Sequence, residues 1–533
     1  MEKIFMSGKK RSVGNVAART FYYLFISKII SLVLTSVAFV VVARLLGPSN
    51  YGTYTFAIAY YSLIGAGGTL GVGSYFSKNL SKLKQDDDLK SIPKILANGY
   101  SFLFPLLAAL ALIGFVLSGF VSSHFASTGV APIYLELASA ILFFSLIEGA
   151  TDSALIGLGK GGLAAVTIIT IDVIQFGLSI FLVLSGYGVI GAIIGLLAGN
   201  VAGFILAMYY ISKEAFFRFG LPERLPKKKE IVEMLRFSMP LGGNNIVMAG
   251  ISNLVVLMLG LFVYQPKYIL GNYGIALKGV ALMAAFYGTV ISTVLPAFSA
   301  TDPSRIGDGE GREDRINKIF LYSLIVTLPV IIYIGVFSKS AIYLFLTDNY
   351  ALAPTYLSII AFGTALGMPA LYLGGFMASL GKTKQLFKCY LYSGIVQIIL
   401  IFFLIPRFNA IGAILSVFVI GNLIYSALIL RKAVEVSKFR FDYNKIARFV
   451  GSGVFVTLIL IAVNLAVLRL GNHYIISLVA GFIALAIVYP QSLVLFKVIN
   501  KEDTALIRRV SEDIPTLGFL ITLLNKYINL FLR

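Results

Sequence analysis

Residues 21–46 read FYYLFISKIISLVLTSVAFVVVARLL, a run of 26 residues in which Lys28 and Arg44 are the only charged side chains. An α-helix crosses the hydrocarbon core of a bilayer with about 20 apolar residues, so this run predicts a membrane-spanning helix. Basic residues precede it, as they do in a signal peptide. Because the run is longer than the about 7–15 residues of a signal-peptide core, we expect a retained first helix.

The composition of the whole chain supports a membrane protein. Of its 533 residues, 58% are hydrophobic and 13% are charged, whereas soluble domains contain about 45–50% apolar and about 25% charged residues. The mean hydropathy is +0.90. These values exclude a soluble enzyme and a disordered chain. The single cysteine, Cys389, excludes internal disulfides and a thiolate metal cluster.

The net charge of +20 raises the question of a nucleic-acid partner. A nucleic-acid-binding protein gathers Lys and Arg on one folded face. In this sequence the basic residues lie between the apolar runs, as topology signals do. We therefore expect membrane lipids, and no nucleic acid, among the partners.

Apolar runs of similar length recur along the chain and predict an all-α integral membrane protein with about fourteen spans. The expected spans are residues 21–46, 52–77, 95–121, 133–157, 162–185, 189–211, 235–264, 268–299, 318–338, 354–379, 386–405, 410–430, 447–468 and 474–496. With the N-terminus inside, 37 Lys and Arg residues fall in inside segments and 5 in outside segments, while Lys28 and Lys278 fall within spans. This asymmetry predicts a multi-pass protein of the cell membrane with both termini in the cytoplasm.

Short identical segments recur at a spacing of 222 residues and predict an internal repeat. Asn50-Tyr51-Gly52 matches Asn272-Tyr273-Gly274, and Leu158-Gly159-Lys160 matches Leu380-Gly381-Lys382. Because each copy contains six helices, both copies enter the membrane from the same side and form two parallel lobes. Two such lobes are typical of an alternating-access carrier. A duplicated bundle without a transport role is the alternative.

The spans and the repeat together predict the domain organisation. It comprises a basic cytoplasmic N-terminus (1–20), an N-lobe of helices 1–6 (21–212), a cytoplasmic linker (213–234), a C-lobe of helices 7–12 (235–432), helices 13–14 (433–498) and a cytoplasmic tail (499–533). The tail carries Asn525, Asn529 and Arg533 at four-residue spacing, which favours an amphipathic helix on the membrane surface. We expect a monomer.

Two lysines within spans predict a polar cavity. An ionised side chain at the bilayer centre costs about 2.5–3.5 kcal/mol on an insertion scale, so Lys28 and Lys278 need a partner or water. Lys28, Asn245 and Lys278 lie on polar stripes of helices 1, 7 and 8. These helices are related by the repeat, so their stripes can line one substrate-binding cavity, with Arg44 as the next candidate. Alternatively, the Ser and Thr hydroxyls of the stripes only bond to their own helix carbonyls.

Three carboxylates in the first copy predict an ion-coupling site. Glu148 and Asp152 are four residues apart in helix 4, and Asp172 lies about halfway along helix 5. A buried carboxylate either pairs with a cation or holds a proton, so we expect a site for H⁺ or Na⁺. The alternative for Asp152 is an ion pair with Lys160 or Lys82.

Sequence signatures of enzymes are absent. The chain contains no HExxH, Walker A or GxSxG motif, and His124 and His473 lie far apart in expected outer loops. We therefore expect no enzymatic activity, no bound metal and no other cofactor.

Three motifs resemble those of a known family. Residues 43–52, ARLLGPSNYG, resemble the A-R-x-L-G-P-x-x-Y-G signature of polysaccharide-biosynthesis flippases of the multidrug/oligosaccharidyl-lipid/polysaccharide exporter superfamily. Residues 237–241, FSMPL, are similar to the F-S-x-P motif of that family, and Leu158-Gly159-Lys160 is similar to its helix 4–5 turn. The resemblance implies that the protein moves an undecaprenyl- or dolichyl-linked oligosaccharide from the inner to the outer leaflet by alternating access.

Two other functions stay open at this point. A cation-coupled multidrug exporter of the same fold would favour an acidic cavity over one that contains lysines. A membrane glycan polymerase or transferase is a weaker alternative, because the expected outer loops are too short for a sizeable catalytic site.

Overall fold

The computed structural model describes residues 13–500, except 223, 225, 302–309, 438, 439 and 472. The expected tail helix and most of the expected basic N-terminus lie outside these residues. The regular elements of the described part are all helices, as the sequence predicts. The chain divides into two compact units, residues 1–271 and residues 272–533, which we call the N-terminal and the C-terminal unit.

Ten helical segments of the described part are long and apolar enough to cross a membrane. Three of them, Ile30–Gly67, Gly161–Phe219 and Thr383–Val436, each contain two of the expected spans, and the shorter apolar helix Ile246–Phe262 contains one more. Each of the fourteen spans predicted from hydropathy therefore lies wholly or largely in helix in the described part of the chain, and the second span, 52–77, is interrupted at residues 65–71.

Non-helical residues separate the paired spans. Helix α1, Val13–Ile64, is interrupted at Gly47, which has φ 68° and ψ 171° and precedes Pro48. A positive φ costs glycine little because it has no Cβ, so the Gly-Pro pair bends the chain between the first two spans. Helix α14, Thr383–Ile414, is interrupted in the same way at Asn409, which has φ 53°.

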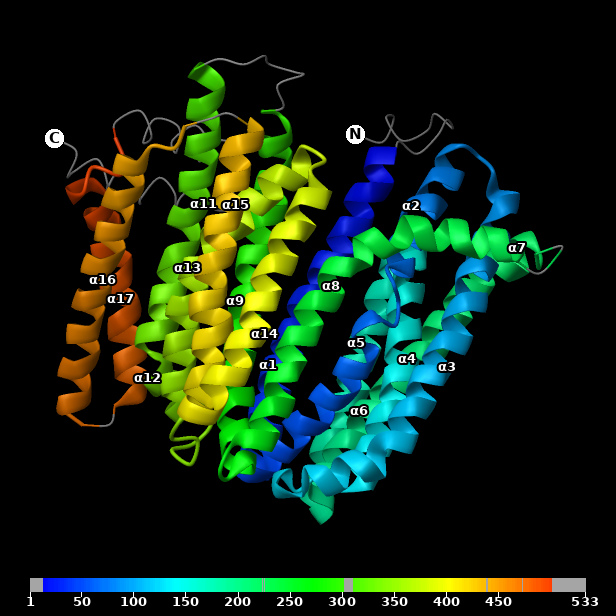
Figure 1. Ribbon diagram of the computed structural model, residues 1–533, viewed down its shortest axis with the longest axis horizontal. Helices are drawn as coiled ribbons and strands as arrows, with labels where there is room; N and C mark the ends of the chain where they lie inside the picture. Colours follow the sequence, from blue (N-terminus) through cyan, green and yellow to red (C-terminus); the bar gives the residue numbers. More distant parts are fainter. Residues whose placement is uncertain are drawn as a thin grey trace, which may run out of the picture. The chain divides into compact units, whose positions relative to one another are not determined.

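The N-terminal unit contains six further helices of at least three turns. They are α2 (Val72–Gln85), α3 (Ile92–His124), α4 (Pro132–Gly157), α5 (Gly161–Leu182), α6 (Gly188–Ile211) and α8 (Lys228–Phe262). Helix α4 packs against α3, α5 and α6, and α8 packs along α1 and α2 (Figure 1). Buried aromatic rings join α2 to α3, with 5.3 Å between the ring centroids of Phe76 and Tyr100.

The end of α6 leads into α8 through a bent segment. A π-helical turn, Ser212–Phe216, is followed by the short α7, Phe217–Phe219, and by Gly220 at φ 85°. The expected cytoplasmic linker is therefore partly helical. The compact unit ends only at Gly271, so α8 belongs to the N-terminal unit although the repeat assigns it to the second copy. The division into two six-helix copies stays a prediction.

The C-terminal unit contains most of α9 (Pro266–Ser299) and the helices that follow it. These are α11 (Glu310–Val336), α12 (Ser338–Phe345), α13 (Ala353–Ser379), α14, a π-helical stretch (Leu415–Gly421), α15 (Asn422–Ser437), α16 (Tyr443–Arg469) and α17 (Tyr474–Leu495). Helices α16 and α17 lie side by side and pack against α11 (Figure 1). A buried group of hydrogen bonds fixes them, because Asn464 Nδ2 donates to the Val336 carbonyl at 3.0 Å and Ser477 Oγ donates to Asn464 Oδ1 at 2.7 Å.

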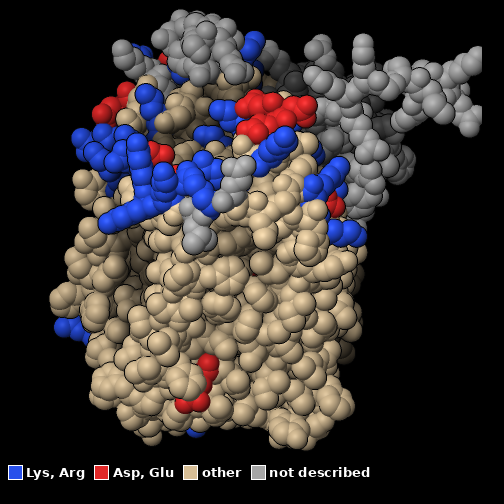
Figure 2. All heavy atoms as spheres, turned by 90° about the vertical axis from the view of Figure 1, so that its right-hand side faces the viewer, with Lys and Arg blue, Asp and Glu red and all other residues tan. Residues whose placement is uncertain are grey.

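The outer faces of the helices are apolar, as contact with lipid requires. On α3, Leu112, Val116 and Phe120 follow a four-residue spacing and are 62%, 70% and 61% exposed. Figure 2 shows a wall of mostly uncharged residues, with one acidic patch near its lower end and a band of Lys and Arg, with some Asp and Glu, near its upper end. An apolar belt bounded by basic residues is the surface of a bilayer-spanning protein.

Candidate substrate and ion-coupling sites

Glu148 and Asp152 form a buried pair of carboxyl groups in the N-terminal unit. They lie one turn apart on α4 and are 8% and 7% exposed. Their side chains are hydrogen bonded to each other. Thr167 Oγ1 of α5 lies 2.7 Å from Asp152 Oδ1 and 2.9 Å from Asp152 Oδ2. Two carboxylates in such contact repel each other strongly, so the pair needs a shared proton or a bound cation.

Other polar groups lie on the same stretch of α4. Tyr100 of α3 donates a hydrogen bond from its hydroxyl to Thr151 Oγ1 at 2.9 Å. Helix α6 comes close at Gly203, where a Cβ would lie 3.6 Å from Glu148 Cγ. The carboxyl pair is thus enclosed by α3, α5 and α6 and does not face the lipid.

One of the two cations that the sequence offers as partners of Asp152, Lys160, has another partner. Lys160 forms an ion pair with Glu214 at 2.8 Å. The described hydrogen bonds of Asp152 go to Thr167 and Glu148. This geometry favours the interpretation of the pair as a proton or cation site.

Asp172 has different neighbours from the pair. It lies on α5, is partly buried and shares a hydrogen bond with Ser31 of α1. Its Oδ2 is buried without a described hydrogen-bond partner. The three carboxylates that the sequence groups together therefore have two sets of neighbours, one between α4 and α5 and one between α5 and α1.

The structure describes only some of the side chains expected to bind substrate. The backbones of Lys28 and Asn245 are helical in α1 and α8, but their side chains lie outside the described residues. Lys278 is exposed, although it lies within α9. Arg44 is exposed near the end of the first half of α1, one turn before Gly47.

Reasoning from the sequence alone missed a close backbone contact in the N-terminal unit. A Cβ on Gly52 would collide with the carbonyl of Lys267, and a Cβ on Gly271 would collide with the carbonyl of Pro48. Nearby, Thr53 Oγ1 donates to the Thr128 carbonyl at 2.7 Å. The motif Asn-Tyr-Gly occurs at residues 50–52 and again at residues 272–274, next to the two contacting segments. The repetition of a motif does not predict that the two backbones are in contact.

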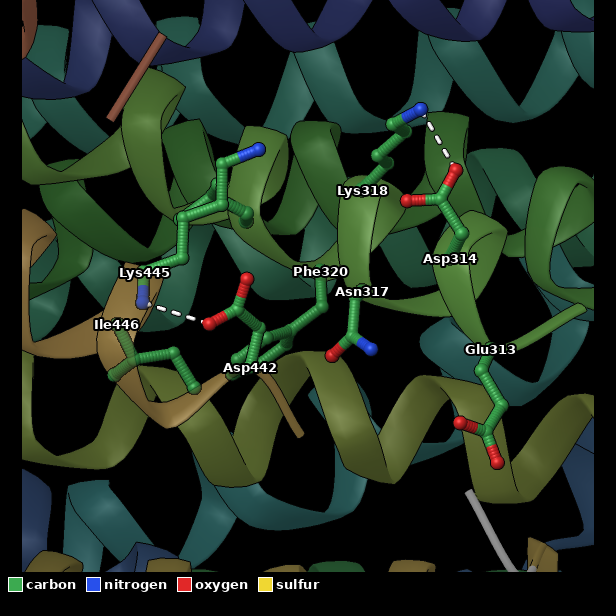
Figure 3. A pocket seen from close by; sticks show the side chains of 9 residues that line it. Glu313, Asp314, Asn317, Lys318, Phe320, Asp442, Lys445 and Ile446 are labelled. Carbon is green, nitrogen blue, oxygen red and sulfur yellow. Dashed lines mark hydrogen bonds and ion pairs between the residues drawn. The ribbon is translucent and has the colours of Figure 1, made fainter. Parts of the chain in front are cut away.

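A separate cavity of about 360 Å³ opens at the ends of α11 and α16. Figure 3 shows Glu313, Asp314 and Lys318 on α11 and Asp442 and Lys445 at the start of α16 around it. Lys318 pairs with Asp314 at 2.7 Å, and Asp442 Oδ1 accepts the backbone N–H of Lys445 at 2.9 Å, which caps α16. The cavity includes none of the expected site residues.

The ten long apolar segments and the shorter helix Ile246–Phe262 account for the fourteen expected spans of a polytopic membrane protein. The buried carboxyl pair gives this protein polar groups in its interior. Residues 41–354 match the sequence profile of the family described as "Polysaccharide biosynthesis protein". The chain belongs to this family, which confirms the resemblance noted in the sequence. No curated protein matches the chain.

Solved structures show the fold. The structure "Lipid II flippase MurJ, inward closed conformation" matches with a TM-score of 0.68 and 15% identity over 89% of this chain and 98% of that one. A MATE family transporter in an inward-facing conformation matches with a TM-score of 0.59 and 15% identity, over 76% of this chain and 94% of that one. A MOP superfamily transporter from Pyrococcus furiosus matches with a TM-score of 0.52 and 15% identity, over 81% of this chain and 99% of that one. The chain therefore has the fold of transporters of the MOP superfamily.

Proposed function

We propose that this protein is a flippase that carries a polyprenyl-linked oligosaccharide or polysaccharide precursor across the cell membrane by alternating access. Membership in a polysaccharide-biosynthesis family, in a chain with this transporter fold, is the observation that carries the proposal. Both termini lie in the cytoplasm, and the protein works as a monomer without a cofactor.

The proposed mechanism assigns different roles to cations and acids. A pyrophosphate headgroup cannot cross the bilayer core without a polar path, because burying its charge is costly. We assign binding of the headgroup to Lys28 and Lys278, with Asn245 and Arg44 as further candidates. Glu148 and Asp152 exchange a proton or Na⁺ during the cycle, and Asp172 is a second candidate for this exchange.

The test uses purified protein in proteoliposomes with a radiolabelled lipid-linked oligosaccharide. A flippase leaves the substrate chemically unchanged, so chromatography should return a single product of the original length. A longer or shortened product would indicate a polymerase or transferase and would contradict the proposal.

A cation-coupled multidrug exporter is the second candidate, and the buried carboxyl pair favours it. Efflux of cationic dyes from energised vesicles distinguishes the two functions. We expect no gradient-driven dye efflux. Efflux that Glu148→Gln abolishes, without transfer of lipid-linked sugar, would support the exporter.

A further inference from the structure

Two cations contact Glu214 and a third, Lys84, lies close by, where α2, the α4–α5 turn and α6–α7 meet. Lys160 Nζ lies 2.8 Å from Glu214 Oε2, and Arg218 Nη1 lies 3.8 Å from the same oxygen. Lys84 Nζ donates to the Leu158 carbonyl at 2.8 Å. Counted by themselves, Lys84, Lys160, Arg218 and Glu214 carry a net charge of +2. We call Lys84, Lys160 and Arg218 the basic cluster.

Lys84 lies close to the charges of the other members of the basic cluster. Partial burial lowers the pKa of Lys84, and the nearby charges of Lys160 and Arg218 lower it further, against the opposite effect of Glu214. Like charges held together in this way are stabilised by an anion that binds between them.

Large apolar side chains lie beside the basic cluster and are not packed into the protein. Phe217 and Leu221 flank Gly220 in the bent segment after α6 and are 80% and 79% exposed. Arg218 itself is 62% exposed and belongs to the same segment. An exposed Phe and Leu next to basic residues at the end of a transmembrane bundle are typical of a segment that inserts at the bilayer surface.

We propose that the basic cluster binds the phosphate headgroup of an anionic phospholipid, whose acyl chains contact Phe217 and Leu221. The positive charge selects an anionic headgroup. The two apolar side chains select a lipid in the bilayer over a soluble anion, because they gain contact only with acyl chains. Figure 2 shows Lys and Arg gathered in a band directly above the apolar wall, where phospholipid headgroups lie.

Lipid retention by the purified full-length protein tests the proposal. The protein is exchanged into micelles with equal amounts of phosphatidylglycerol and phosphatidylcholine, and bound lipid is counted by native mass spectrometry. We expect preferential retention of phosphatidylglycerol. Lys84→Gln or Arg218→Gln should each reduce the preference by about fivefold, and the double variant by on the order of 30-fold, because each basic residue near a surface contributes about 1 kcal/mol.

Matched variants separate the proposed site from general charge and from misfolding. Lys90→Gln removes an exposed lysine of the same unit outside the basic cluster and should leave the preference unchanged. Arg218→Lys keeps the charge and should retain most of the preference, and every variant should elute as a monodisperse peak. Equal retention of both lipids by the unsubstituted protein, or an equal loss in Lys90→Gln, would overturn the proposal. So would complete displacement of phosphatidylglycerol by millimolar inorganic phosphate, which would identify a site for a soluble anion.

Discussion

Glu148 and Asp152 are hydrogen bonded inside the N-terminal unit, with Thr167 on the side of α5. Two carboxylates in contact repel each other unless a proton or a cation joins them, so the pair can take up or release an ion without facing the lipid. This property makes the pair a better candidate for ion coupling than Asp172, whose described hydrogen bond goes to a serine.

We expect Glu148→Gln and Asp152→Asn to reduce the dependence of transport on a proton or Na⁺ gradient by about 5–150-fold, the range of a coupling free energy of about 1–3 kcal/mol. The protein should still fold, because an amide has the same shape and no charge to desolvate. The gradient dependence is measured as transport into vesicles with an imposed proton or Na⁺ gradient. Asp172→Asn serves as the comparison, and unchanged gradient dependence in both pair variants would exclude the pair as the coupling site.

The contacts of Glu230 at the start of α8 predict how the stability of the folded protein depends on pH. It accepts the backbone N–H of Lys227 at 2.9 Å and pairs with Lys94 of α3 at 3.0 Å. The Lys227 N–H, followed by Lys94 and Arg224, lowers the pKa of Glu230 to about 2. A lowered pKa means that the carboxylate stabilises the folded state above the unfolded pKa of about 4.5 and that this contribution is lost as the pH falls towards 2.

Glu230→Gln should therefore lower the melting temperature at pH 7, and the difference from the unsubstituted protein should shrink between pH 4.5 and pH 2. Thermal unfolding in detergent at several pH values measures it. Glu233→Gln changes an exposed neighbour of the same charge and should have little effect at any pH. A difference that stays constant over this range would contradict the assigned role of Glu230.

The sequence predicts only part of the arrangement of these carboxylates. The four-residue spacing of Glu148 and Asp152 predicts that they share a face of one helix, and the structure places them in contact. Their partner Thr167 is on another helix, and no spacing in the sequence relates the two. The separation of Asp172 from the pair depends on how α5 packs against α1, which hydropathy does not specify.

At the scale of whole elements, the expected spans agree with the helices because lipid requires every backbone polar group in a span to bond internally. Local signals also mark the breaks, since Gly47-Pro48 separates the first two spans. The second span is less regular than expected. It is interrupted between Ile64 and Val72, where Gly71 has φ 77°, and the five glycines of residues 65–73 are the sequence signal for this interruption.

The contact at Gly52 gives a prediction for these elements. Gly52→Ala would place a methyl group against the Lys267 carbonyl, which cannot rotate away, so α1 and α9 must separate. Overpacking of this kind costs about 1–3 kcal/mol. We expect a lower free energy of unfolding in denaturant titrations. Gly250→Ala on α8 is the control, because a Cβ there has nothing within 4 Å and its effect should stay within about 0.5 kcal/mol. Equal stability of the two variants would show that the contact does not constrain the fold.

For the whole molecule, the sequence predicts the number of helices better than their grouping. The short matches at a spacing of 222 residues predict two copies of six helices, and this division stays a prediction. In the structure α8, which the repeat assigns to the second copy, contacts α1, α2 and α3 within the N-terminal unit. Which helices lie side by side depends on complementary side-chain surfaces that are distant in the sequence.

The orientation in the membrane gives a further prediction at this scale. Cysteines introduced at Ser127 and Ser185 should react with an impermeant thiol reagent added to intact cells. Cysteines at Gln85 and Lys228 should react only after the membrane is opened, because the basic residues favour the cytoplasm for these segments. Cys389 is buried, so it adds little background. Labelling of the Lys228 position from outside would contradict both the orientation and the number of spans before it.

The transfer of a lipid-linked oligosaccharide between leaflets tests the central claim most directly. Fluorescent lipid-linked oligosaccharide is reconstituted with the protein in liposomes, and an impermeant reagent that destroys the fluorophore reports the outer-leaflet fraction. We predict that the protein exposes nearly all of the substrate to the reagent, whereas Lys28→Ala/Lys278→Ala behaves like protein-free liposomes. Protection of the inner-leaflet fraction in the presence of folded, unsubstituted protein would contradict the assignment as a flippase.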